Sequence, residues 1–581
     1  MYKNCYVHRR GEDYDNFIVH LWTDEGYTVE EFQNYGYQEC PQHQATHRGL
    51  GGESLKKIYN WYRNSEGLHY TDHTLGNMHI KFLLDKYGTN DEPSKTHREV
   101  FFDIEIEMGG ALTDKYIKSA PKPVTSIAWW DKQVDEWTIV ILDKTGEIKA
   151  GKQDGREIIP VSRETDLLET FLSRMEAIAP DILVGYNSDY FDIPYLYYRI
   201  YNRLGKRNAK RLSPIGVVKE QTWSTDQPIR IAGVASLDYM RLHKKYSFQQ
   251  EPSMKLDFLG EKYVGQKKIE YNGSLDRLFA EDKQKFIEYN FVDVLILKKL
   301  DEKFKYLDLT KNISHKGKTL YEDVYQSSKT QDGAISAYLL NEGIIPPNKD
   351  PNPIIKEDED GNKLSYAGGY LFCPKTGIYN YMFDEDLTSL YPSIIMSLNI
   401  GKETLVGRIK IPSEKVVVEG KEIFNCRYAL NDLKAMDPNT ELNIENPQRR
   451  IAQMKVSKII KLIEEANLAV SANGVMYRTD SDSVLKTILS KWFDERVIYK
   501  NKMKEAYQAG DKALGEQMHL KQHTMKILLN SLYGATALGS FRYGNVILSE
   551  SITLTGQRII QESALFANTH MNQVMKGKIK L

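Results

Sequence analysis

The sequence has little of what marks membrane and secreted proteins. Its 581 residues contain no apolar run near the roughly 18 residues that a membrane span needs. The first five residues, Met1 to Cys5, lead into polar residues, so we expect no secretory signal. Cys5, Cys40, Cys373 and Cys426 form no CxxC pair, which argues against a disulfide framework or a cysteine zinc site. We therefore expect a soluble protein in a reducing cytoplasm.

Net charge is also nearly absent, but its distribution is uneven. The 78 Lys and Arg residues almost balance the 79 Asp and Glu residues. Residues 486–581 alone hold 14 basic and 7 acidic residues, a balance of +7, which leaves about −8 for residues 1–485. A basic stretch behind an acidic body suits an enzyme that holds a polyanion beside carboxylate-bound metal ions. A solvated lysine-rich helix surface would give the same charge pattern.

Local patterns divide the chain into several regions. Its length corresponds to about four domains of roughly 150 residues, and we find no internal repeat. Strand-like and helix-like patterns alternate from residue 98 to about 305, which is typical of an α/β domain. The proline-rich segment 344–353 cannot continue a helix or a central strand, so it is predicted to be a linker. Residues 487–532 have a long helical pattern interrupted near Gly510, which predicts an antiparallel helix pair.

Two acids, Asp103 and Glu105, interrupt the apolar run that follows Glu99. Because side chains alternate along a strand, Asp103 and Glu105 fall on one face, and Ile104 and Ile106 point into a core. A carboxylate pair at the end of a sheet suits a hard cation such as Mg²⁺. An edge strand with its polar face in water would have the same spacing.

Three further residues extend this acidic set. Asp192 follows a predicted buried strand and opens a helix, where it also fits a simple helix cap. On a predicted helix farther along, spacing of four puts Tyr289 and Asp293 on one face, and a buried acid there needs a partner. The four acids would converge on two metal ions that activate a water and stabilise the leaving oxygen in phosphodiester hydrolysis, with Tyr289 positioning that water.

A second constellation lies near residue 386. Residues 382–395 predict a strand joined to a helix that a proline initiates. Backbone N–H groups at such a junction can cradle phosphate, Asp386 can hold a metal ion, and Tyr391 can lie against a sugar. A capped helix with a core tyrosine would have the same pattern. Farther on, Lys526 and Asn530 are four residues apart on one polar helix face.

A zinc site is the rival interpretation for one segment. Cys40, His43 and His47, with His69 or His73 as a fourth ligand, have spacings that permit a zinc cage. The segment has no other feature of a zinc module, so we interpret it as a surface loop.

Three short motifs within the acidic set carry a family resemblance. They are Phe102-Asp103-Ile104-Glu105, Asn187 with Phe191-Asp192, and Tyr289-Asn290-Phe291-Val292-Asp293. They resemble the three exonuclease motifs of the proofreading domain of family B DNA polymerases, above all the replicative polymerases of large tailed phages. Residues 217–236 resemble the β-hairpin that helps the primer end move between the two sites of those enzymes.

The second constellation resembles the polymerase motifs of the same family. Residues 382–395 resemble motif A, in which the aspartate binds metal and the tyrosine excludes a ribose 2′-OH. Residues 526–534 resemble motif B of the fingers, and residues 366–369 resemble the YxGG element that contacts the template. The basic residues Arg496 and Lys500 match two further triphosphate-binding positions.

The resemblance assigns roles residue by residue. It implies that the catalytic residues are Asp103, Glu105, Asp192, Tyr289, Asp293 and Asp386. Metal ligation is implied for Asp103, Glu105, Asp192, Asp293, Asp386 and Leu387, with two Mg²⁺ ions per active site. Nucleotide binding is implied for Ser389, Leu390, Tyr391, Arg496, Lys500, Lys526 and Asn530. DNA binding is implied for Tyr366, Gly368, Gly369, Tyr533 and Gly534.

One element of the family pattern has no counterpart here. Family members carry a second palm aspartate in a Tyr-Gly-Asp-Thr-Asp-Ser turn after motif B, and this sequence has no such turn. Asp480 and Asp482 precede motif B and match the approach to the fingers instead. The resemblance thus covers about the first two-thirds of a family member. This implies either a fragment or a split polymerase, whose second polypeptide would carry the turn, the thumb and the contact with the sliding clamp.

The implied fold is a multidomain α/β and α+β chain, with an RNase H-like exonuclease domain before an incomplete right-hand palm with helical fingers. The implied division is an N-terminal domain (1–97), the exonuclease (98–305), a return to the N-terminal domain with the linker (306–357), the palm (358–482), the fingers (483–539) and a second palm segment (540–581). The implied function is primer extension by two-metal phosphoryl transfer, with proofreading, in viral DNA replication in the cytoplasm of an infected bacterium. We expect this chain alone to degrade 3′ ends but not to extend a primer. A stand-alone 3′→5′ exonuclease and a non-catalytic DNA-binding subunit are the alternatives.

Overall fold

The structure is a computed structural model that describes most of the chain in two compact units. The described residues are 1–11, 15–59, 67–71, 75–221, 227–247, 249–350, 368–371, 376–378, 386–387, 389–411, 415–418 and 421–576. The first unit comprises Met1–Gly36, Ile58–Asn64 and Asp72–Gln326, and the second comprises Tyr37–Lys57, Ser65–Thr71 and Ser327–Leu581. The predicted N-terminal domain, residues 1–97, is therefore distributed over both units. The finer six-part division stays a prediction.

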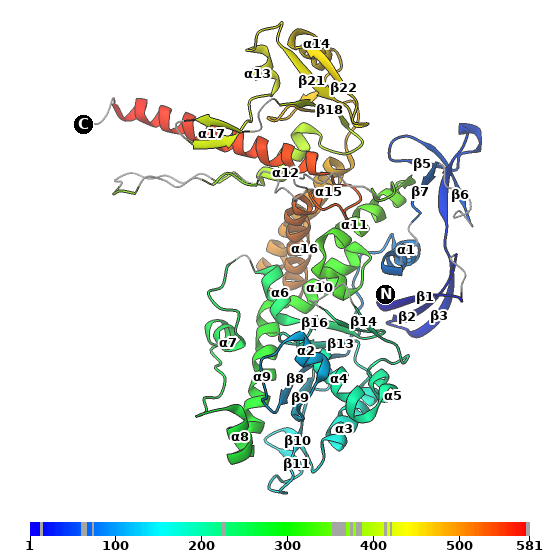
Figure 1. Ribbon diagram of the computed structural model, residues 1–581, viewed down its shortest axis with the longest axis vertical. Helices are drawn as coiled ribbons and strands as arrows, with labels where there is room; N and C mark the ends of the chain where they lie inside the picture. The colour runs from blue at the N-terminus through cyan, green and yellow to red at the C-terminus, as the bar shows by residue number, and fades with distance from the viewer. Residues whose placement is uncertain are drawn as a thin grey trace. The chain divides into compact units, whose positions relative to one another are not determined.

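The first unit is a mixed α/β assembly (Figure 1). Its strands are β1 (Tyr2–Arg9), β2 (Asn16–Thr23), β3 (Gly26–Gln33), β8 (Glu99–Ile106), β9 (Val124–Asp131), β10 (Glu136–Leu142), β11 (Gly151–Gln153), β12 (Arg156–Val161), β13 (Ile182–Gly185), β14 (Val218–Glu220), β15 (Ile229–Ile231) and β16 (Ala235–Asp238). Its helices are α1 (Leu75–Tyr87), α2 (Asp114–Ser119), α3 (Glu164–Ile178), α4 (Asp192–Leu204), α5 (Lys206–Ala209), α6 (Tyr239–Tyr246), α7 (Leu256–Val264), α8 (Leu275–Glu281), α9 (Lys283–Phe304) and α10 (Tyr306–Gly317). The alternation predicted from residue 98 to about 305 is confirmed.

A seven-stranded sheet forms the centre of the first unit, in the order β11-β12-β10-β9-β8-β13-β16. β8 pairs antiparallel with β9 and parallel with β13, which in turn pairs parallel with β16. Parallel neighbours need long crossovers, and α4 belongs to the one that joins β13 to β16. The sheet thus places the start of α4 beside the strand that carries the first two acids.

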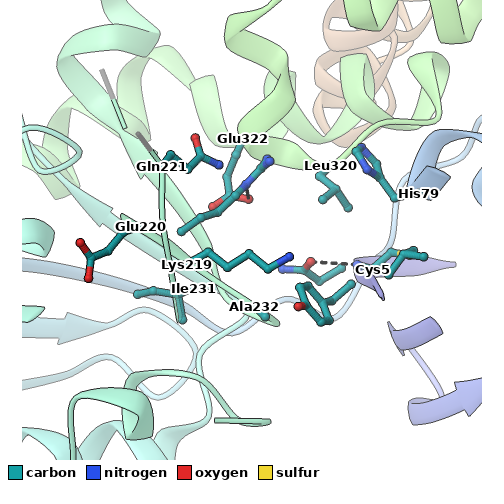
Figure 2. Close-up of a pocket in the computed structure, with 13 residues that line it drawn as sticks. Cys5, His79, Lys219, Glu220, Gln221, Ile231, Ala232, Leu320 and Glu322 are labelled. Atoms are coloured by element: carbon teal, nitrogen blue, oxygen red, sulfur yellow. Dashed lines mark hydrogen bonds and ion pairs between the residues drawn. The ribbon is translucent and has the colours of Figure 1, made fainter. Parts of the chain in front are cut away.

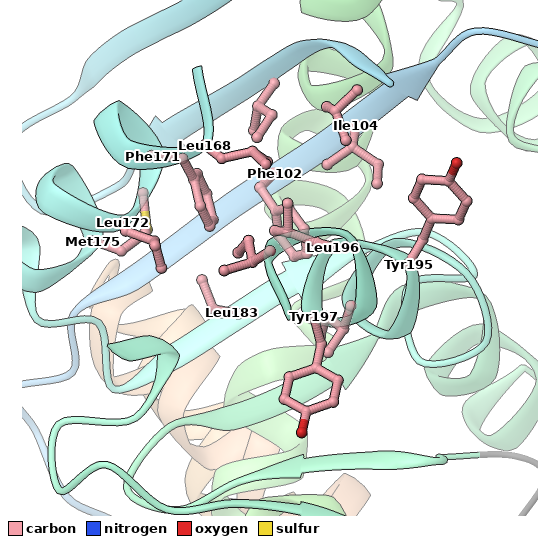
Figure 3. Close-up of a cluster of buried hydrophobic side chains, with 14 of the residues drawn as sticks. Phe102, Ile104, Leu168, Phe171, Leu172, Met175, Leu183, Tyr195, Leu196 and Tyr197 are labelled. Atoms are coloured by element: carbon pink, nitrogen blue, oxygen red, sulfur yellow. The ribbon is translucent and has the colours of Figure 1, made fainter. Parts of the chain in front are cut away.

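The alternation predicted along β8 is confirmed. Phe102, Ile104 and Ile106 are buried in one hydrophobic cluster with residues of α3, α4 and β13 (Figure 3). Because successive side chains point to opposite faces, Asp103 and Glu105 are directed away from this cluster. The packing of one face therefore fixes the direction of the two acids on the other.

The predicted hairpin within residues 217–236 is present as β14 paired antiparallel with β15, and residues 222–226 lie outside the described part of the chain. Arg230 on β15 donates to Glu322 at 3.3 Å and to Asp323 at 3.1 Å, in the short 3₁₀ helix η4 (Tyr321–Tyr325). A cavity of about 200 Å³ lies beside it, lined by β1, the hairpin and η4 (Figure 2). These ion pairs tie the base of the hairpin to the rest of the first unit.

The second unit contains two five-stranded sheets and long helices. Its strands are β4 (Gly36–Glu39), β5 (His47–Gly49), β6 (Ser54–Ile58), β7 (Leu68–His69), β17 (Ile344–Ile345), β18 (Leu405–Lys410), β19 (Lys415–Val418), β20 (Lys421–Phe424), β21 (Glu441–Glu445), β22 (Ile451–Lys455), β23 (Ala469–Val470) and β24 (Val475–Tyr477). Its helices are α11 (Ser327–Asn341), α12 (Leu390–Leu398), α13 (Leu430–Lys434), α14 (Val456–Glu465), α15 (Val484–Gln508), α16 (Lys512–Thr536) and α17 (Val546–Lys576). The segment predicted as a linker begins with β17, which pairs parallel with β5 at the edge of the sheet order β17-β5-β6-β4-β7.

The helix pair predicted around Gly510 is confirmed. α15 and α16 lie side by side, joined by a three-residue turn in which Gly510 has φ +79° (Figure 1). Ser483 caps the start of α15 by accepting from the Lys486 N–H at 3.1 Å. Asp511 caps α16 in the same way, accepting from the Leu514 N–H at 3.0 Å. A capping residue thus marks the start of each helix, and Gly510 marks the reversal between them.

Within the described residues, none of the helices is long and apolar enough to cross a membrane.

Phe171 on α3 tests the core that directs β8. Its ring is 1% exposed and packs edge-on against Trp129, with ring centroids 6.0 Å apart. We expect Phe171→Ala to lower the free energy of unfolding of the first unit by about 3–5 kcal/mol, because it leaves a cavity. Denaturant titration followed by tryptophan fluorescence measures the change. Val134→Ala, at a position 49% exposed, is the matched control and should change it by less than about 0.5 kcal/mol; an equal effect of both would contradict the assignment.

Candidate active site

Three carboxylates meet on the polar face of β8. Oxygen atoms of Asp103, Glu105 and Asp293 all lie within 4.8 Å of one another, and among the described residues this is the one group with a metal-ligating arrangement. The first two come from β8 and the third from the buried side of α9. The face shared by Tyr289 and Asp293, predicted from helical spacing, thus lies against the strand.

Asp192 lies beside this group without belonging to it. It is the first residue of α4, and its Oδ1 accepts the backbone N–H of Ile104 at 3.2 Å. Its negative charge contributes to the raised pKa of Asp103. The structure therefore brings the four predicted acids to one place, three as a tight cluster and Asp192 at its side.

Lys268 is a member of the site that the sequence did not indicate. Its Nζ forms an ion pair with Oδ2 of Asp293 and lies 3.3 Å from the Tyr289 hydroxyl oxygen. Burial alone would lower the pKa of Lys268, but Asp293, Tyr289 and Asp103 together raise it above its usual value. The lysine is thus a permanent cation next to the carboxylates.

Asn290 is the second such residue. Its Nδ2 donates to Oδ2 of Asp103 at 2.8 Å, and its Oδ1 accepts from the Ser126 hydroxyl at 2.7 Å. The side chain is fully buried, so both contacts fix its orientation. Asn290 therefore holds one oxygen of Asp103 in place. Asn290 lies within the third motif of the family resemblance, but the sequence predicted functional roles only for its neighbours Tyr289 and Asp293.

Burial and mutual repulsion raise the pKa values of the acids. Burial, and then the charge of Asp293, raises the pKa of Glu105 to about 8. Burial raises the pKa of Asp192 to about 7, and burial followed by Asp293 and Glu105 raises that of Asp103 well above its usual value. A single lysine does not offset this much buried negative charge.

The cluster fits divalent cations. Oδ1 of Asp293 is buried without a hydrogen-bond partner within the described structure, although its other oxygen is paired with Lys268. Carboxylate oxygens are the ligands that Mg²⁺ and Mn²⁺ prefer. The unsatisfied oxygen and the raised pKa values together indicate a site built for more positive charge than the protein supplies.

In the second unit, two predicted tyrosines meet. The rings of Tyr391, in the first turn of α12, and Tyr533, near the end of α16, have centroids 4.3 Å apart. Gly369 and Gly556 approach Tyr391 so closely that an added Cβ would lie 3.2 Å and 3.1 Å from its side-chain atoms. Gln557 donates to the Gly368 carbonyl at 2.7 Å. Segments far apart in the sequence therefore converge on Tyr391.

The predicted basic residues lie on the helix pair. Arg496 and Lys500 are on α15, and Lys526 is on α16. Burial, followed by the positive charges of His519, Lys526 and Arg496, lowers the pKa of His523 to about 4. The two helices thus share a local concentration of positive charge.

Within the described part of the chain, the remaining predicted residues of the second unit have few contacts that support their predicted roles. Ser389 precedes α12 with φ +55°, and Leu390 begins that helix. Asp386, Leu387, Asn530 and Gly534 are exposed, and no metal-ligating group among the described residues includes Asp386. Tyr366 lies outside the described residues.

Two alternative interpretations find no support in the described part of the chain. His69 pairs with Glu39 at 3.0 Å, His47 packs on Tyr37, and neither joins a metal-ligating group with Cys40 or His43; His73 lies outside the described residues. Asp482 pairs with Lys486 at 2.5 Å at the start of α15. These contacts fit a surface loop in the first segment. In the second segment they fit the approach to the fingers that the family resemblance implies.

Comparison with known proteins gives two family matches. The model for DNA polymerase family B matches residues 324–580, and that for the exonuclease domain of DNA polymerase family B matches residues 60–259. The second match ends before Tyr289 and Asp293, which the structure brings to the site.

Curated relatives extend over nearly the whole chain. A DNA-directed DNA polymerase of Escherichia phage RB69 is 28% identical over 94% of this chain and 64% of its own length. The corresponding protein of Enterobacteria phage T4 is 25% identical over 90% of this chain and 61% of its own. A DNA polymerase of Pyrococcus glycovorans is 23% identical over 83% and 52%. The chain spans about three fifths of the length of the two phage relatives.

The raised pKa values predict how the stability of the metal-free protein depends on pH. Unfolding returns Glu105 and Asp192 to pKa values near 4, so between about pH 4.5 and pH 8 the folded state holds protons that the unfolded state releases. Stability contributed by these groups is present at low pH and is lost as the pH rises through about 8. We expect the Tm in EDTA to fall between about pH 6 and pH 8.5, and saturating Mg²⁺ to reduce that fall.

Glu105→Gln tests the origin of this dependence. The variant should lose part of the fall in Tm, because Gln does not titrate. An unchanged fall in Glu105→Gln, or no effect of Mg²⁺ on the wild type, would contradict the interpretation.

Proposed function

The chain belongs to the family B DNA polymerases, and from this premise we propose that its first unit is a metal-dependent 3′→5′ exonuclease and its second unit binds primer–template and deoxynucleoside triphosphate. The observation that carries the first part is the convergence of Asp103, Glu105 and Asp293 within 4.8 Å. The two phage relatives support a role in viral DNA replication inside a bacterial host.

The three clustered carboxylates, with Asp192 beside them, would hold two divalent ions. When bound, such ions stabilise charge on the phosphodiester and lower the pKa of an attacking water. The orphaned Oδ1 of Asp293 and the raised pKa of Glu105 both support ligation there, because each reports an unmet need for positive charge. Asn290 keeps Asp103 oriented whether or not a cation is present.

Tyr289 would donate a hydrogen bond beside the scissile bond, and Lys268 would orient its hydroxyl group. Burial and then Asp293 raise the pKa of Tyr289, so the phenol stays protonated at neutral pH. Because Lys268 donates to the phenol oxygen, the Tyr289 proton is directed away from the lysine. Tyr289 is then a hydrogen-bond donor for a water or a phosphate oxygen rather than a base.

The sheet order supports the exonuclease proposal further. Five consecutive strands, from β10 to the edge strand β16, run β10-β9-β8-β13-β16. In chain order they are the third, second, first, fourth and fifth of these five, and only the second is antiparallel to its neighbours. This is the arrangement that an RNase H-like domain has. It puts the carboxyl end of the first strand beside the start of the helix that follows the fourth.

The second unit supports nucleotide and DNA binding through the surroundings of Tyr391. Tyr533 and Gly369 pack on that tyrosine, which would face the sugar of an incoming nucleotide. Asp386, five residues before Tyr391 in the sequence, would hold a metal ion with the triphosphate. The positive charge shared by α15 and α16 would neutralise the phosphates.

The exonuclease proposal is tested with a 5′-labelled single strand and Mg²⁺. We expect residues 1–581 to shorten it from the 3′ end, and Asp293→Asn to slow the reaction by about 100-fold or more, because it removes a carboxylate that would ligate the metal ions. Asp154→Asn is the matched control, since its side chain is 87% exposed in the same unit. Undiminished cleavage by Asp293→Asn, or no cleavage by the wild type, would contradict the proposal.

Nucleotide binding is tested separately by titrating a fluorescent deoxynucleoside triphosphate with Mg²⁺. Lys526→Met should weaken binding by about 10-fold or more, because a hydrogen bond to a charged group is lost. Lys521→Met removes the same charge from the same helix at a position where the ammonium lies 5.7 Å from the Tyr499 ring centroid, and it should leave affinity within about 3-fold. Equal losses in both variants would show a diffuse charge effect and contradict a specific role for Lys526.

A further inference from the structure

A further pair of buried acids lies in and next to the loop that leads to Asp192. Asp189 and Asp238 are 2% and 1% exposed, and neither belongs to the cluster of three carboxylates. Asp189 is in the loop between β13 and α4, and Asp238 ends β16. Burial, and then the charge of Asp238, raises the pKa of Asp189, and such neighbouring buried carboxylates are costly unless a cation compensates them.

Arg241 is the cation that faces this pair. Its Nη1 donates to Oδ2 of Asp189 at 2.7 Å, and its guanidinium lies 3.9 Å from the centroid of the Tyr325 ring. The Ser236 hydroxyl donates to the other oxygen of Asp189 at 2.6 Å. The positive charge of Arg241 acts on both acids and opposes the effect of burial on each.

The same acids hold the loop at two points, Asn187 and Asp189. Asn187 has φ +62°, a conformation that is rare for residues with a side chain, and its N–H donates to Oδ1 of Asp238 at 2.9 Å. Asp238 also caps α6, accepting from the Met240 N–H at 2.9 Å. Two residues after Asn187, Asp189 is held by Arg241, and three residues later α4 begins with Asp192.

We propose that Arg241 is a positioning residue of the exonuclease site: by pairing with Asp189 it fixes the loop that presents Asp192 to β8. The inference rests on the proposed function of the first unit. Without Arg241, Asp189 would lose the ion pair that ties its loop to α6, and the carboxyl buried beside Asp238 would have to take up a proton or open the loop towards water. Opening would remove Asp192 from the Ile104 N–H and loosen that side of the metal site.

The test compares Mn²⁺ binding, followed by electron paramagnetic resonance, and 3′-end cleavage in the full chain of residues 1–581. We expect Arg241→Met to weaken both by about 10- to 100-fold, as the loss of a group that orients metal ligands does. Asp189→Asn/Arg241→Met should recover to within about 3-fold of the wild type, because the uncompensated charge is gone while Asn still accepts the Ser236 hydroxyl.

The matched control is Arg211→Met. Arg211 also pairs with acids of the first unit, Glu169 and Glu176 at 2.7 Å each, but on its surface, so Mn²⁺ binding and cleavage should not change. Circular dichroism establishes that each variant is folded. If Arg241→Met does not fold, the double variant decides the question by itself.

Two outcomes would overturn the inference. One is a folded Arg241→Met that binds Mn²⁺ like the wild type, and the other is a double variant that binds as weakly as the single one. A wild-type chain that binds Mn²⁺ without cleaving DNA would instead refute the exonuclease proposal, while the comparison of Mn²⁺ affinities would still test Arg241.

Discussion

Uncompensated negative charge in the interior is the constraint on which the first unit depends. Asp103, Glu105, Asp192 and Asp293 converge in a partly desolvated place, and their raised pKa values express the cost of that convergence. Around them the protein arranges what offsets this cost: the Lys268 ammonium, the Asn290 amide and the Ile104 N–H. What remains unsatisfied, above all Oδ1 of Asp293, is the feature that supports the proposal of a bound cation at this place.

Apolar packing on one face of β8 determines the direction in which Asp103 and Glu105 point on the other face. Burial of Phe102, Ile104 and Ile106 leaves β8 no freedom to rotate or to shift by one residue, because a slip would exchange its two faces. The parallel pairing of β13 with β8 and β16 then places the loop before α4 between two fixed strands. The site is therefore rigid on the strand side, and the loop side depends on the ion pair between Asp189 and Arg241.

The second unit differs from the first. Its predicted site residues are brought together by close packing around Tyr391 rather than by buried charge. Glycines at 369 and 556 let two segments contact the Tyr391 ring, and Tyr533 covers it from α16. Positive charge is concentrated on the helix pair, where burial, followed by repulsion from neighbouring cations, lowers the pKa of His523. An anion bound there would relieve that repulsion, as a cation would relieve the repulsion among the carboxylates of the first unit.

The sequence by itself determined the local features: the two faces of β8, the shared face of Tyr289 and Asp293, and the reversal of the helix pair at Gly510. Each follows from a period or a cap that neighbouring residues define. Only the tertiary structure decided that Lys268 pairs with Asp293, that Asn290 orients Asp103, and that Arg241 compensates Asp189. The partners in these three contacts are 25, 187 and 52 positions apart in the sequence. No periodic pattern records such pairs, because they arise when the sheet order brings separate segments together and burial then requires each charge to find a partner.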